Sequence, residues 1–190
     1  MNTSAVPVRK IGMIGPQPSF WSILYRTMMT HTVTYFVTGI VASILLGYAT
    51  RMVRPDVEPI IRKMTDPVLM ASPLLQPFRA VLLAIVFYLL RDVLFNNRKG
   101  WLIMWCTLVV IGILTPFSAS WGGIEGMIFF NLPLWDHIVG WPEVFSQTLF
   151  LSLILTYWVD HPNSKRLRVL MLVGFILTIL LPVINLLLKI

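Results

Sequence analysis

Residues 31–49, HTVTYFVTGIVASILLGYA, form an apolar stretch without a single Lys, Arg, Asp or Glu. A helix needs about 20 mostly apolar residues to cross the roughly 30 Å hydrocarbon layer of a bilayer. This stretch therefore predicts a membrane-spanning helix. Four more stretches of the same character follow along the chain, at residues 74–95, 101–117, 142–159 and 167–188.

The composition agrees with this interpretation. Of the 190 residues, 57% are hydrophobic and only 12% are charged, whereas a soluble domain carries about 25% charged residues. A disordered chain would be poor in apolar residues and is excluded as well. The sequence predicts an all-α, polytopic membrane helix bundle of five spans, with residues 1–190 as one domain. Four spans result if the second stretch lies shallow, and six if residues 121–139 re-enter the bilayer.

Residues 19–29 have aromatic and aliphatic side chains at helical spacing, after a proline-rich segment. This pattern is typical of a short interfacial helix, but it fits an extension of the first span equally well. Both interpretations remain open at this stage.

The distribution of Lys and Arg predicts the orientation, because cytoplasmic loops are enriched in basic residues. Residues 118–142 contain no Lys or Arg, so this segment is expected outside, together with residues 50–73. The N-terminus is then inside. No signal peptide with an uninterrupted apolar core is found before residue 31, and we expect integration into a bacterial cytoplasmic membrane.

The formal net charge of +7 raises the question of nucleic-acid binding. Such binding needs basic residues clustered on one face or helix. Here they stand in short runs beside the spans, where they contact anionic lipid headgroups. The expected partners are therefore the lipid bilayer and partner membrane subunits, and not nucleic acid.

Ionisable residues near the spans fall into an inner and an outer layer, which leaves the middle of the bilayer nearly free of charge. This counts against an ion-coupled carrier, because such carriers place a carboxylate or His near the midplane. Arg79, near the start of the second span, needs a carboxylate partner, and Glu125 or Glu143 is the candidate. Glu125 is either such a partner or a working carboxylate in an apolar setting.

The segment 118–143 is the most unusual part of the sequence. Trp121, Trp135 and Trp141 predict either an interfacial aromatic belt or the lining of a ligand cavity. Asp136 and His137, with Glu125 and Glu143, are the candidate acid–base groups of an enzyme at the outer interface. Hydrolase, metalloprotease and nucleotide-binding motifs are absent from the sequence.

Gly39, Ser43 and Gly47 repeat every four residues, a spacing that lets two membrane helices approach closely. His31 and His161 fall at the same predicted leaflet. Two such residues could hold a haem iron if both rings projected inward at equal depth, but ordinary interfacial histidines explain them as well. No metal and no cofactor is expected.

Three classes of function follow from these patterns. The first is a non-catalytic accessory or scaffold component of a membrane complex, because the sequence lacks catalytic motifs and charge at the midplane. The second is a small transporter or permease component. The third is an enzyme acting on a lipid-like substrate at the outer interface, with Arg79, Glu125 and the tryptophans converging on one cavity.

Overall fold

The computed structural model describes residues 17–115 and 120–188. Within these ranges the chain forms helices, turns and loops, and no strand. The long helices are α1 (Phe20–Leu45), α4 (Gln76–Leu89), α6 (Gly100–Leu114), α9 (Trp141–Asp160) and α10 (Lys165–Leu188). The short ones are α2 (Tyr48–Arg51), α3 (Pro67–Met70), η1 (Ser72–Leu75, a 3₁₀ turn), α5 (Arg91–Leu94), α7 (Gly126–Phe129) and α8 (Leu134–Ile138).

The predicted all-helical membrane bundle is confirmed. Four helical stretches are long and apolar enough to cross a membrane: α1, η1 with α4, α8 with α9, and α10. The second predicted span is therefore long enough to cross. The third, α6, has 15 residues and extends over only about 22 Å; its predicted last residues, 116 and 117, lie outside the described residues.

Helix α1 runs without interruption from Phe20 to Leu45. The Ser19 hydroxyl accepts a hydrogen bond from the Ser22 N–H at 3.3 Å and caps the first turn. Residues 20–29 therefore lengthen the first span, and no separate interfacial helix forms. At the other end, Gly47 adopts a left-handed φ of 63° and turns the chain into α2, so α1 ends before the predicted residue 49.

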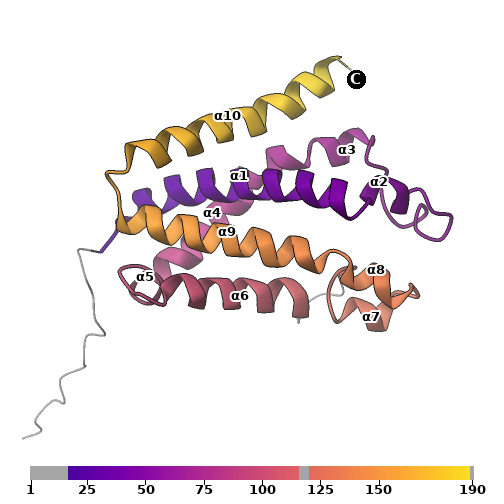
Figure 1. Cartoon of the computed structure of the whole chain (residues 1–190), viewed down its shortest axis with the longest axis horizontal. Coiled ribbons are helices and arrows are strands. Elements are labelled where there is room, and N and C mark those ends of the chain that lie inside the picture. Colours follow the sequence, from indigo (N-terminus) through magenta and orange to yellow (C-terminus); the bar gives the residue numbers. More distant parts are fainter. Residues whose placement is uncertain (1–16, 116–119, 189–190) are drawn as a thin grey trace, which may run out of the picture.

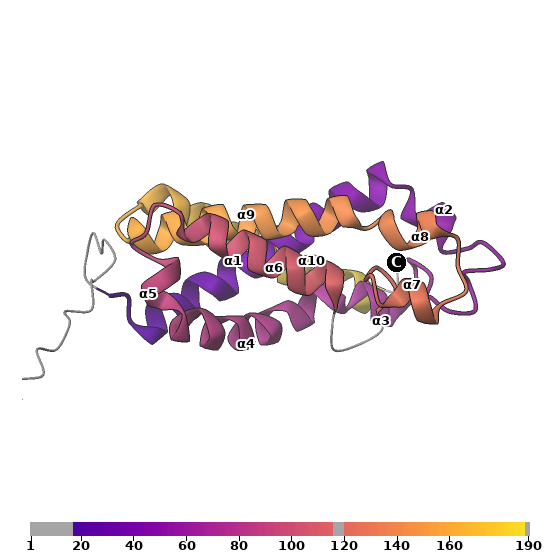
Figure 2. The same cartoon turned by 90° about the horizontal axis from the view of Figure 1, so that it is seen from below.

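Helix α1 occupies the centre of the bundle. It packs against α4, α9 and α10, while α6 packs against the far side of α9 (Figure 1). The view from below shows that α4 and α9 lie on opposite sides of α1 (Figure 2). The main apolar cluster joins α1, α4, α5, α6 and α9 through Ile23, Ala84, Phe87, Leu94, Phe95, Met104, Leu151, Leu155 and Val159.

Glycines allow two of these helix pairs to approach closely. A Cβ atom on Gly174 of α10 would lie 3.1 Å from the Val33 side chain of α1. A Cβ atom on Gly112 of α6 would lie 3.1 Å from the Val144 side chain of α9. Both distances are tighter than ordinary van der Waals contact, so these positions favour a residue without a side chain.

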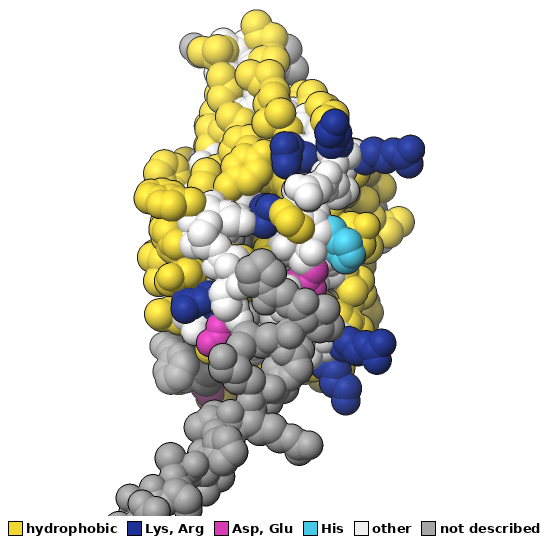
Figure 3. All heavy atoms as spheres, turned by 90° about the vertical axis from the view of Figure 1, so that its left-hand side faces the viewer, with side chains coloured by type: hydrophobic (Ala, Val, Ile, Leu, Met, Phe, Trp, Pro, Cys, Tyr) yellow, Lys and Arg dark blue, Asp and Glu magenta, His cyan; other side chains and the backbone are white. Residues whose placement is uncertain are grey.

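The two ends of the bundle differ in charge. We call the end that holds the start of α1, residues 91–100 and residues 160–168 the basic end; Figure 3 shows Lys and Arg side chains around its rim. Its described basic residues are Arg26, Arg91, Arg98, Lys99, Lys165, Arg166 and Arg168, against the acidic Asp92 and Asp160. The opposite end, with residues 46–71 and 120–140, is called the loop end. There α7 and α8 lie beyond the end of α6 (Figures 1 and 2).

Candidate functional site

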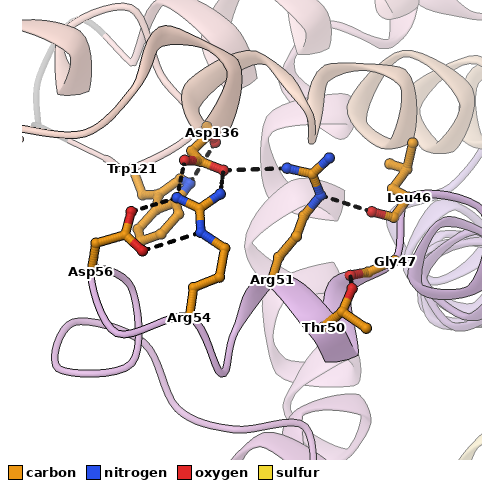
Figure 4. A network of polar contacts seen from close by, with 8 residues as sticks. All are labelled: Leu46, Gly47, Thr50, Arg51, Arg54, Asp56, Trp121 and Asp136. Atoms are coloured by element: carbon orange, nitrogen blue, oxygen red, sulfur yellow. Dashed lines mark hydrogen bonds and ion pairs between the residues drawn. The ribbon is translucent and has the colours of Figure 1, made fainter.

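A buried carboxylate joins the two long segments of the loop end. Asp136 of α8 is 2% exposed and accepts hydrogen bonds from Arg51 at 3.3 Å and from both terminal nitrogens of Arg54, at 3.0 and 2.8 Å (Figure 4). Arg54 also pairs with Asp56. The two arginines come from residues 46–71, so Asp136 ties that segment to residues 120–140.

Hydrogen bonds from aromatic rings to backbone carbonyls hold residues 121–141 together. The Trp121 indole N–H donates to the Asp136 backbone carbonyl at 2.8 Å, and the Trp141 indole N–H donates to that of Gly122 at 2.8 Å. The His137 ring is 1% exposed, and its Nδ1 lies 2.8 Å from the Trp121 carbonyl, so Nδ1–H is the donor. Trp135, in contrast, is 57% exposed. Trp121 and Trp141 therefore fasten the segment to itself.

The structure does not bring the predicted acid–base groups together around one cavity. Asp136 and His137 lie in the junction just described. Glu125 is half-buried at the start of α7, and its carboxylate forms no ion pair with any described residue. None of these three residues lines the main cavities of the described chain.

Glu143 stands apart from them, in a cavity of about 610 Å³ near the loop end. Its carboxylate accepts a hydrogen bond from the Tyr48 hydroxyl at 2.8 Å. Burial, and next the neighbouring Glu143, raise the pKa of Tyr48 above its usual range, so the hydroxyl keeps its proton. The other walls are mostly apolar and include Tyr35, Phe36, Ile40, Met52, Met64, Leu69, Met70, Leu181, Pro182 and Ile184.

The predicted small-residue stripe contributes to this cavity. Gly39 and Ser43 line it, and a Cβ atom on Gly39 would lie 3.6 Å from the Glu143 carboxylate. Gly47 has already left α1 through its left-handed turn. The three residues therefore do not form one face against a neighbouring helix; the close-packing glycines of the bundle are Gly112 and Gly174.

The two candidate haem ligands lie at different depths. Helices α1 and α9 are antiparallel, and the Tyr25 ring contacts the Trp158 ring at 5.7 Å. His31 lies six residues beyond Tyr25 toward the loop end, while His161 lies three residues beyond Trp158 toward the basic end. They are about 13 Å apart along the bundle, so the structure does not place both rings on one iron. The described residues contain no cluster of three metal-ligating side chains.

His31 lies near the middle of the bundle, between its basic end and its loop end. It follows Phe20 by eleven residues in the 26-residue α1, about 16 Å into the helix. The ring is 7% exposed, lies beside Gln76, and has no hydrogen-bond partner for either nitrogen within the described part of the chain. The prediction that His31 lies at the inner leaflet, beside a middle nearly free of charge, is therefore wrong for this residue, because α1 begins earlier than predicted.

Several hydroxyl groups within the long helices bond to their own helix. Thr34, Thr38, Ser152, Thr156 and Thr178 each donate to the carbonyl four residues earlier in their own helix. These side chains are satisfied without a partner helix.

Arg79 lies far from both of its predicted partners. The Phe20 ring of α1 contacts the Tyr88 ring of α4 at 5.4 Å, and the helices are antiparallel, so Arg79 is level with about residue 29 of α1. This is near the middle of the bundle. The side chain is exposed on the outer face of α4, and it forms no ion pair among residues 17–115 and 120–188.

Sequence reasoning missed Tyr48, Arg51, Arg54 and Gln76 as contact residues. The spacing of the two arginines, three residues apart after a glycine turn, is a signal for one face of a short helix. The sequence does not show that this face meets Asp136, more than eighty residues away.

Comparison with known protein families, with curated proteins and with solved structures finds no significant match for this chain.

Proposed function

We propose that this protein is a non-catalytic subunit of a membrane protein complex, and that its partner binds the exposed face of α4. The observation that carries the proposal is the position of Arg79. This face consists of Leu75, Phe78, Arg79, Leu82, Val86 and Leu89, which recur at three- and four-residue spacing.

An arginine exposed to lipid at this depth is unfavourable. Insertion experiments give a cost of about 2.5–3.5 kcal/mol for a charged residue at the centre of a membrane helix, and simulations of an isolated helix give more. The neighbours of Arg79 on this face do not shield it from lipid, since Phe78 is 72% exposed and Leu82 is 67% exposed. The cost of exposing the guanidinium therefore remains. A carboxylate on a partner helix would neutralise the guanidinium and cover the apolar side chains together.

A second copy of this chain does not supply that carboxylate. Among the described residues, Asp92 and Asp160 lie at the basic end, and the remaining acids lie at the loop end or, for Glu143, in the cavity with Tyr48. None is exposed at the depth of Arg79. We therefore infer a different membrane protein that carries an Asp or Glu within a spanning helix.

The geometry gives less support to an enzyme at the outer interface. That hypothesis requires Arg79, Glu125 and the tryptophans around one cavity. Arg79 faces outward from α4, Glu125 stands at the start of α7, and Trp121 and Trp141 donate their N–H groups to backbone carbonyls. These positions favour a structural role for the loop end.

The charge difference between the two ends supports the orientation. Among the described residues, the loop end holds four basic side chains, those of Arg51, Arg54, Arg62 and Lys63, whereas the basic end holds seven. The positive-inside rule then favours the basic end, and with it the N-terminus, on the cytoplasmic side.

The proposal is tested by co-purification from the native membrane after mild solubilisation. We expect a stoichiometric membrane protein with the wild-type chain and its loss with Arg79→Leu, by at least a hundredfold in affinity, because the partner's carboxylate then stays buried and unpaired. Arg62→Leu, at an exposed position of the loop end, is the matched control and should retain the partner.

Two further results would contradict the proposal. One is a wild-type protein that purifies alone under every mild condition. The other is a complex that survives Arg79→Leu. A folding defect is separable from these outcomes, since isolated Arg79→Leu should unfold at an unchanged or higher temperature. Replacing the partner's carboxylate by Leu in the same complex should restore binding, because an apolar pair can substitute for a buried ion pair.

A transporter component is the second candidate, and His31 favours it. Tyr35 lines the cavity near the loop end, and its ring lies 6.4 Å from the His31 ring. A transport path would need water to reach His31 from both ends. Labelling of His31→Cys by a water-soluble maleimide, in a Cys106→Ser background, tests this; an unlabelled thiol would contradict it.

A further inference from the structure

The cavity at the basic end has the composition of an amphipathic binding site. It measures about 1080 Å³ and lies between the start of α6, the end of α9 and the start of α10. Arg98 and Arg166 stand on its polar side, and Trp101 and Tyr157 contribute aromatic rings. Its aliphatic wall includes Leu153, Ile154, Leu167 and Leu170.

The polar side of this cavity carries more positive than negative charge, with two arginines against one carboxylate. Neither Arg98 nor Arg166 forms an ion pair with any residue that the structure describes. One carboxylate, that of Asp160, also lines the cavity, and it accepts a hydrogen bond from the Asn96 backbone N–H at 2.9 Å. His161 stacks on Tyr157, with ring centroids 4.3 Å apart.

The apolar side continues onto the surface that faces hydrocarbon. Leu153 is 39% exposed, Tyr157 is 54% exposed, and Leu170 is 63% exposed. These side chains run from the cavity along α9 and α10, in the direction in which the acyl chains of a bilayer lipid extend. A small soluble anion would pair with the arginines and leave this wall uncovered.

We propose that the cavity binds an anionic phospholipid from the leaflet at the basic end. The phosphate lies between Arg98 and Arg166, and one acyl chain covers Leu153, Ile154 and Leu170. Basic pockets between spanning helices at the cytoplasmic side are suited to such headgroups. This site is on the α9 and α10 side of the bundle, and it does not depend on a partner at α4.

The test uses the full chain, delipidated in detergent, with lipid binding measured by native mass spectrometry. Phosphatidylglycerol should bind at least tenfold more tightly than phosphatidylcholine with the same acyl chains. Arg98→Gln with Arg166→Gln should weaken phosphatidylglycerol binding about 30-fold, since each guanidinium paired directly with the phosphate contributes about 1 kcal/mol. Both arginines are exposed, so the double variant should fold, and an unchanged unfolding temperature checks this.

The matched control is Lys99→Gln with Lys165→Gln. This double variant also removes two positive charges at the basic end. Lys99 and Lys165 are each one residue away from an arginine of the cavity, but they do not line it. We expect a loss of less than about threefold there, because only the general surface attraction falls. An equal loss in both double variants would refute a defined site, and so would equal binding of the two lipids. Inorganic phosphate that displaces the lipid at millimolar concentration would overturn the choice of a lipid over a free anion.

Discussion

Replacing Asp136 by Asn tests whether the loop end is held by one buried carboxylate. The substitution keeps the size of the side chain and removes its charge. It also turns one acceptor oxygen into an NH₂ group, which cannot accept from a guanidinium. The remaining oxygen can accept only part of the three hydrogen bonds from Arg51 and Arg54, so at least one guanidinium N–H then faces a donor (Figure 4).

The expected cost is about 2 kcal/mol. Hydrogen bonds to charged groups contribute about 1.5–3 kcal/mol each, and Asp136 is only 2% exposed. The figure counts one hydrogen bond lost at the buried Asp136 side chain. It is taken from the lower part of the range because the arginine partners are 28% and 35% exposed, so water replaces part of the loss. For a chain of this size, 2 kcal/mol lowers the unfolding temperature by about 4–8 °C.

Two measurements check this prediction. Thermal unfolding in detergent, followed by tryptophan fluorescence, should show the lower transition temperature. Hydrogen exchange should accelerate in residues 46–60 and in residues 120–140 together, because the carboxylate joins the two segments. Asp56→Asn is the matched control: Asp56 also pairs with Arg54 but is 49% exposed, so this variant should unfold close to the wild-type temperature.

The reasoning is refuted if Asp136→Asn unfolds like the wild type, or if only one of the two segments exchanges faster. Either result would mean that other contacts hold residues 46–60 against residues 120–140. The ion pairs of Asp136 would then not be needed to keep the two segments together. A drop in Asp56→Asn as large as that in Asp136→Asn would also contradict it, because the effect would then not depend on burial.

Three further predictions concern the same end of the molecule. A Cβ atom on Gly126 would lie 2.0 Å from the Ser120 backbone oxygen, so Gly126→Ala should cost about 1–3 kcal/mol, seen as a lower unfolding temperature. Trp121→Phe leaves a backbone carbonyl without its donor and should cost about 1 kcal/mol in the same assay, whereas Trp135→Phe, at a 57% exposed position, should have no measurable effect. The Val68 N–H and then the neighbouring Arg62 lower the pKa of Asp66. The cap of α3 is therefore stable above the ordinary carboxyl pKa of about 4 and is lost as the pH falls through the lowered value. Amide exchange of Val68, followed by NMR against pH, should rise only in that acidic range.

The spans could be predicted from the sequence because each depends on local composition alone. The limits of α9 and α10 lie within two residues of the predicted ones. The start of α1 could not be placed, since Arg26 interrupts the apolar pattern. In the structure this side chain donates to the Ser22 hydroxyl in its own helix and lies over the Trp158 ring, and α1 continues past it.

The candidate site was less predictable because it depends on contacts between distant segments. Apolar residues occur all round α4, so its sequence does not show which face packs on α1 and which faces outward with Arg79. The depth of His31 followed from the start of α1 and was misplaced with it. The sequence also does not show that the Trp121 indole donates to a backbone carbonyl while Trp135 is exposed.

The central position of α1 has a consequence for how the protein is made. This helix leaves the ribosome before all three helices that cover it, and α9 begins almost a hundred residues after α1 ends. At about 5–20 residues per second, this interval lasts roughly 5–20 s. Throughout that time α1 lacks the neighbours that α9 and α10 later supply, and α4 is the first of its three covering helices to be made. A nascent chain with this order of synthesis depends on the insertion machinery, or on early pairing of α1 with α4. Either would hold α1, with its buried polar side chains, in the membrane until its last partners arrive.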